Sequence, residues 1–225
     1  MGHVLNYDTA RDYNRLENLD SLEYKLISHL IYSKSSHADK IWKILKYDEV
    51  DALSKESVSI QDRVALVSAD SGVEAGKRVF LAPFTDDAFT EQCSHIHFYI
   101  EGLYPTDHLT AKVVVGIETI VHSKISVIAA ESDEDPTANP NDYTDKDKEE
   151  RIVLYKNRAT VLLKHVLAEF NGLIIDGIGN LQFNRQTSSY SSSTYGLWNN
   201  RAYYGHLTKM AVQMAGVSDN SSQGY

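Results

Sequence analysis

The stretch 110–122 is the feature that most restricts the fold of this chain. Apolar side chains alternate along it with a period of two residues, which is typical of a β-strand with one buried face. The other face mixes Lys112, Glu118 and His122 with Val114 and Ile120 and is therefore only partly polar. The first face carries Ala111, Val113, Val115, Ile117 and Val121. The stretch predicts a long strand, and with it a sheet.

Further strands are predicted on both sides of this one. Residues 78–81 and 95–100 precede it, a short apolar continuation over 125–129 follows it, and residues 178–184 and 203–214 come later in the chain. The connections between the strands look too short for parallel crossovers, so antiparallel pairing is expected.

The first 70 residues predict short helices. Asp20 with Glu23, and Ser36 with Asp39, have the spacing of helix-capping pairs. Two further helical turns are expected over 48–53 and 59–67. The apolar residues with helical spacing are Leu22, Leu26, Ile27, Leu30 and Ile31, then Ile41, Trp42, Ile44 and Leu45.

Residues 151–170 predict the best helix, with Gly172 as its C-terminal cap. This helix should cover one face of the sheet. The fold class expected is therefore α+β, with a helical N-terminal arm and an antiparallel β-sheet or sandwich under one long helix from the C-terminal half. The domain division expected is a helical arm over 1–70, a core over 71–216 and a flexible tail over 217–225.

The net charge of the 225-residue chain is −9, and most of it lies in one segment. Residues 131–150 hold nine acidic residues and two lysines, so the remainder of the chain carries only −2. The segment predicts a mobile loop that faces solvent or a DNA channel through Asp133, Glu134, Asp135, Asp142 and Asp145. A nearly neutral body without a basic stripe makes a sequence-specific nucleic-acid reader a poor hypothesis.

A second loop, residues 185–200, is rich in serine and tyrosine. Tyrosine and tryptophan provide large contact areas at little cost in rotamer entropy. We therefore expect contacts between subunits or rings at Trp198, Tyr190, Tyr195 and Tyr203. Trp42, in contrast, lies in a helical apolar stripe and is expected in the core.

Few residues suggest catalysis. His95 and His97 share a strand face, and His122 could join them as a third metal ligand, but surface or half-buried structural histidines are the simpler interpretation. Cys93 lacks a setting that would activate it as a nucleophile, and as the only cysteine it cannot form an internal disulfide. We expect neither an enzyme nor a cofactor. No apolar run approaches the roughly 20 residues of a membrane span, so no membrane association is expected.

The sequence resembles the neck proteins of tailed bacteriophages over residues 22–212. The similar motifs are Ile41-Trp42-Lys43-Ile44-Leu45-Lys46-Tyr47, Asp51-Ala52-Leu53, Arg78-Val79-Phe80, Ser94-His95-Ile96-His97-Phe98-Tyr99 with the stretch 113–128, Asp176-Gly177-Ile178-Gly179-Asn180-Leu181 and Tyr203-Tyr204-Gly205. The acidic segment matches nothing in the family pattern.

The resemblance implies a structural virion protein that forms a homomeric ring, commonly a hexamer, between portal and tail. Such a head-closure (stopper) protein or tail terminator would contact portal or adaptor proteins and tail tube proteins, and would pass genomic DNA without reading its sequence. It would be assembled in the cytoplasm of the bacterial host. A portal-proximal adaptor is a related possibility, and a metal-dependent enzyme using His95, His97 and His122 is the alternative function.

Overall fold

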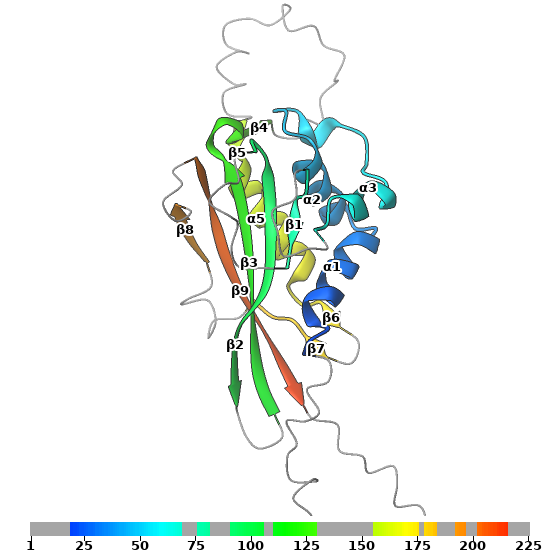
Figure 1. The fold of residues 1–225 in the computed structure, drawn as a ribbon, viewed down its shortest axis with the longest axis vertical. Helices are drawn as coiled ribbons and strands as arrows, with labels where there is room; N and C mark the ends of the chain where they lie inside the picture. Colours follow the sequence, from blue (N-terminus) through cyan, green and yellow to red (C-terminus); the bar gives the residue numbers. More distant parts are fainter. Residues whose placement is uncertain are drawn as a thin grey trace, which may run out of the picture.

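The chain folds into a five-stranded sheet with helices packed on one face (Figure 1). The computed structural model describes residues 19–68, 76–81, 91–105, 110–129, 155–175, 178–183, 192–196 and 202–215. The strand order in the sheet is β1-β2-β3-β9-β8. The predicted α+β class is confirmed.

Three long antiparallel strands form the centre of the sheet: β2 (Ser94–Pro105), β3 (Thr110–His122) and β9 (Tyr203–Ala215). β3 has the bounds predicted from its alternating sequence. Figure 1 shows the lower ends of these strands running on past the helices. At that end of β2, Leu103 and Tyr104 are exposed.

The expectation of purely antiparallel pairing is wrong at one edge of the sheet. β1 (Val79–Phe80) pairs with β2 in parallel. Residues 81–93 connect the two strands, and this length is enough for a parallel crossover, which needs about a dozen residues. β8 (Ser192–Gly196) forms the opposite edge and is antiparallel to β9.

The N-terminal helices lie where the apolar spacing predicts them: α1 (Leu22–Tyr32), α2 (Ser36–Lys46), η2 (Ala52–Ser54) and α3 (Ile60–Ala65). Their caps differ from the prediction. Ser35 caps α2 by accepting a hydrogen bond from the backbone N–H of Ala38 at 2.9 Å. Glu23 does not cap α1, because its carboxylate accepts the N–H of Ile100 at 2.9 Å. Ile100 lies at a register shift of β2, so Glu23 attaches α1 to an irregular point of the sheet.

The helix predicted over 151–170 begins later, as α5 (Arg158–Phe170). Residues 155–157 are wrongly predicted as helix, because they form β5 (Tyr155–Asn157), which pairs with β4 (Val127–Ala129). The Asn157 side chain starts α5 by accepting the N–H of Thr160 at 3.1 Å. Residues 151–154 lie outside the described part of the chain. Gly172 follows the end of α5 with φ of 84°, as its expected role requires.

Short elements complete the fold. The turn η3 (Ser123–Ile125) joins β3 to β4. β6 (Ile174–Ile175) and β7 (Gly179–Asn180) form a small hairpin after α5. The strand predicted over 178–184 is therefore shorter than expected, although Gln182 makes a bridge to Ala211 of β9.

One hydrophobic cluster joins the helices to the inner face of the sheet. It contains Trp42, which is fully buried as predicted and donates its Nε1–H to the carbonyl oxygen of Leu30 at 2.8 Å. The predicted helical arm and the predicted core region contribute to this same cluster. In the described part of the chain, no helix is both long and apolar enough to cross a bilayer.

Two buried arginines connect helices to neighbouring segments of the chain through hydrogen bonds to backbone carbonyl groups. Arg158, at the start of α5, is fully buried and donates hydrogen bonds to the carbonyl oxygens of Tyr47, Asp48 and Glu49. Arg63 of α3 donates to those of Val58, Ile31 and Ser33. Each guanidinium satisfies carbonyl groups at or near the end of one helix, and Arg63 also satisfies one just before the start of α3.

Candidate functional site: an exposed groove beside helix α1

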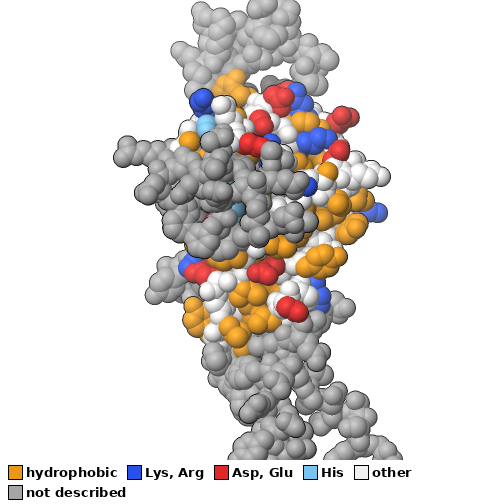
Figure 2. All heavy atoms as spheres, in the orientation of Figure 1, with side chains coloured by type: hydrophobic (Ala, Val, Ile, Leu, Met, Phe, Trp, Pro, Cys, Tyr) orange, Lys and Arg blue, Asp and Glu red, His pale blue; other side chains and the backbone are white. Residues whose placement is uncertain are grey.

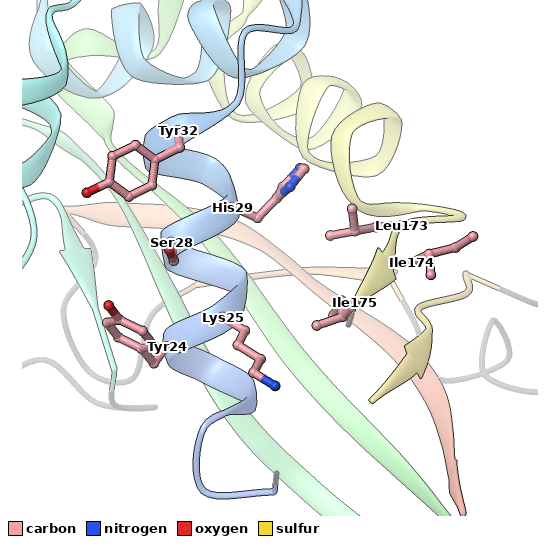
Figure 3. Close-up of a pocket in the computed structure, with 8 residues that line it drawn as sticks. All are labelled: Tyr24, Lys25, Ser28, His29, Tyr32, Leu173, Ile174 and Ile175. Atoms are coloured by element: carbon pink, nitrogen blue, oxygen red, sulfur yellow. The ribbon is translucent and has the colours of Figure 1, made fainter. Parts of the chain in front are cut away.

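An open groove of about 370 Å³ lies between α1 and the segment that follows α5 (Figure 3). On the side of the molecule where Figure 1 places α1, hydrophobic side chains reach the surface (Figure 2). The groove is lined by Tyr24, Lys25, Ser28, His29 and Tyr32 of α1 and by Leu173, Ile174 and Ile175.

Three large apolar side chains of this groove are unusually exposed. Ile174 is 78% exposed, Tyr24 68% and Tyr32 61%, which makes them the three most exposed large hydrophobic residues in the described part of the chain. Tyr24, Ser28 and Tyr32 are spaced by four and share one row of the helix surface. Figure 3 shows the two tyrosine rings projecting from the same side of α1.

A buried carboxylate holds α1 against α5 under the groove. Glu169 of α5 accepts a hydrogen bond from His29 Nε2 at 2.8 Å and another from the hydroxyl of Ser35. Burial alone would raise the pKa of Glu169, but the hydrogen bonds from His29, Ser35 and Ser33 outweigh it and lower the pKa to about 2. The carboxylate is therefore charged at neutral pH and fixes three segments of chain around it.

The cluster of Glu169, His29 and Ser35 has the arrangement of a structural contact between helices. The carboxylate lies between the serine and the histidine, whereas nucleophilic catalysis needs the histidine between serine and carboxylate. The exposed tyrosines and Ile174 offer rigid apolar contact area, the property that characterises protein-binding surfaces.

The outer face of the sheet brings the three predicted histidines into one neighbourhood. His95 and His97 are fully buried, with ring centroids 5.1 Å apart, and His122 is nearly buried. The ring of Tyr203 packs against both His95 and His122, with distances between ring centroids of 5.7 Å and 5.0 Å. Burial, together with the charges of His97 and Arg78, lowers the pKa of His95 well below its usual range. Within the described ranges, no group of three or more histidine, cysteine, aspartate or glutamate residues could hold a metal ion.

Only some of the residues predicted to contact other subunits or to face a DNA channel lie in the described part of the chain. Trp198 and Tyr190 lie outside the described residues, and so do Asp133, Glu134, Asp135, Asp142 and Asp145 of the acidic loop. Tyr195 belongs to the edge strand β8, where only the backbone is described. Tyr203 is 4% exposed and its hydroxyl donates to the carbonyl oxygen of Glu91 at 2.6 Å. The contacts between subunits expected at these residues stay a prediction.

The sequence interpretation missed the groove. Its signal was present on α1, where two tyrosines lie opposite the buried row of Leu22, Leu26 and Leu30. An aromatic pair on the polar face of an amphipathic helix indicates a contact surface. Ile174 gave no such signal, because an isoleucine in a strand-like stretch is expected to be buried.

The fold is that of an α+β protein with a mixed five-stranded sheet and an exposed apolar groove. Residues 38–210 match the YomW family, so the chain belongs to this phage-associated family. Searches of curated proteins and of solved structures found no match.

Proposed function

We propose that this chain is a structural subunit of a bacteriophage neck ring, either a head-closure (stopper) protein or a tail terminator. One observation carries the proposal: the molecule offers two unlike contact surfaces on opposite sides. The α1 groove lies on one side and the edge strand β8 on the other (Figure 1). A head-to-tail ring requires two different surfaces on each subunit, because each copy contacts one neighbour through each surface.

The edge strand suits such a contact. Among the described strands, β8 pairs with β9 alone, so the hydrogen-bonding groups along its other side face away from the sheet. An open strand edge is a ready template for pairing with another chain. A second copy is the occupant proposed for the groove, because a closed ring leaves neither surface exposed. Membership of a phage-associated family agrees with a virion component.

In this function the protein works through assembly and not through catalysis. Its partners are copies of itself, with a hexamer expected, together with portal or adaptor proteins on one side and tail tube proteins on the other. Genomic DNA passes through the ring without sequence-specific binding. The subunit is assembled in the host cytoplasm and retained in the virion.

The test compares two isoleucine variants of the purified chain. Ile174→Asp places a charge in the groove, whereas Ile60→Asp places the same charge at an exposed position of α3, outside the groove. Native mass spectrometry of the wild type and of Ile60→Asp should show the same closed oligomer, a multiple of the 25.3 kDa chain mass. Ile174→Asp should remain monomeric. Identical oligomers for all three proteins would exclude the groove as a subunit interface.

A further inference from the structure

A second, smaller pocket lies at the end of the molecule where β4 and β5 meet α2 and α5 (Figure 1). Its volume is about 130 Å³, and it is lined by Lys40, Leu53, Ala129, Lys156, Val161, Lys164 and His165. The lysines come from three different elements: α2, β5 and α5. Positions far apart in the sequence are thus gathered around one small space.

The composition of the lining is unusual for this chain. Three of its residues are lysines, and the described residues that line it include no carboxylate, although the whole chain carries a charge of −9. In the described part of the chain, neither Lys156 nor Lys164 takes part in an ion pair. Lys156 and Lys164 line the same pocket, and an anion bound there would offset the repulsion between their like charges.

The pocket also has a defined floor. Leu53 and Val161, which line it, are both buried. His165 is 5% exposed, and its Nδ1 is hydrogen-bonded to Nδ1 of His37 at 3.0 Å, which fixes the orientation of the ring. The side chains that form the base are therefore held in place, while the charged ends of the lysines can adjust to a ligand.

We propose that this pocket binds an oxyanion group of the phosphate or carboxylate class. Its volume lies well below the roughly 300 Å³ at which pockets for whole cofactors begin, so one charged head group fits and a nucleotide does not. Lysine binds such groups as a point charge that can approach from several directions. The site is separate from the α1 groove and does not depend on the proposed ring.

The oxyanion can come from two sources. A phosphate group can enter from solution or from a larger ligand. The chain itself supplies carboxylates, because the sequence between Ala129 and Lys156, two residues of the pocket lining, contains the nine acidic residues of segment 131–150. Both sources offer the same chemistry to the three lysines, and the experiment separates them.

The experiment is calorimetric titration of the full chain with inorganic phosphate at pH 7.5, with ionic strength matched by sodium chloride. The test variant is Lys156→Gln/Lys164→Gln. The control, Lys34→Gln/Lys124→Gln, removes the same charge from two other exposed lysines. The wild type and the control should bind phosphate equally, and the test variant should bind at least about ten-fold more weakly, which is about 1.4 kcal/mol. Phosphate binding of equal strength in all three proteins is a general salt effect and overturns the proposal.

A further variant identifies the source of the oxyanion. Asp142, Asp145, Asp147, Glu149 and Glu150 are replaced by their amides, and the titration is repeated with and without the Lys156→Gln/Lys164→Gln change. Phosphate binding that appears only after this replacement, and is lost with the two lysines, assigns the pocket to the chain's own carboxylates. Binding already present in the wild type assigns it to an external phosphate. Absence of binding in both backgrounds overturns the proposal.

Discussion

Replacement of Glu169 by glutamine tests how α1 and α5 are held together beneath the groove. The side chain of Glu169 is 4% exposed, and its pKa is lowered from 4.5 to about 2. A difference of 2.5 in pKa corresponds to about 3.4 kcal/mol of folding free energy as an upper limit at pH 7. Because the pKa is lower in the folded state, this stabilisation is complete above the unfolded value of 4.5 and is lost as the pH falls toward 2.

Urea unfolding followed by tryptophan fluorescence measures the effect. Glu169→Gln should lower the free energy of unfolding by about 2–3 kcal/mol at pH 7, and the difference from wild type should shrink to about 1 kcal/mol at pH 3. Glu56→Gln, at an exposed position, is the control and should change stability by less than about 0.5 kcal/mol. If Glu169→Gln is as stable as the control, or if its deficit is the same at both pH values, the carboxylate does not hold these helices.

Three further changes test other parts of the fold. Arg158→Met leaves the carbonyl groups of residues 47–49 without their donor, and should destabilise the chain by about 3–5 kcal/mol in urea unfolding. The thiol of Cys93 is buried and its pKa is raised to about 12, so iodoacetamide at pH 8 should label it only after unfolding; rapid labelling of the native protein would contradict its burial. Gly205→Ala would place a Cβ 2.0 Å from the carbonyl oxygen of Thr119 and should lower stability by about 3 kcal/mol, and a neutral effect would refute this close approach.

The parts of the fold that local periodicity encodes were predictable from the sequence. The alternating residues of β3 and the helical stripe of α1 gave their elements nearly to the residue. The parallel pairing of β1 was not predictable in the same way, because two residues carry no period and the pairing depends on a distant strand. Residues 155–157 of the predicted long helix instead form a ladder with β4, a partner that local propensity does not reveal.

The candidate sites depend on tertiary proximity, and the sequence revealed them less well. Nothing in the sequence pattern singles out Lys40, Lys156 and Lys164. They come to line one pocket only in the folded chain. Glu169 looks like an exposed position of an amphipathic helix, yet it is buried by the side chains of α1 and the following turn. His95 and His97 were expected at or near the surface, and the fold buries both. Burial of polar residues is decided by what packs against them, which composition does not record.

The most direct test of the central proposal is to locate the protein in the assembled phage particle. Electron microscopy of purified virions carrying a tagged copy of the chain, together with mass spectrometry of the same particles, reports its position and copy number. The proposal predicts a single ring of label between capsid and tail, with a copy number equal to the number of subunits in the purified oligomer. Particles that lack the chain, or label anywhere other than the neck, would contradict it.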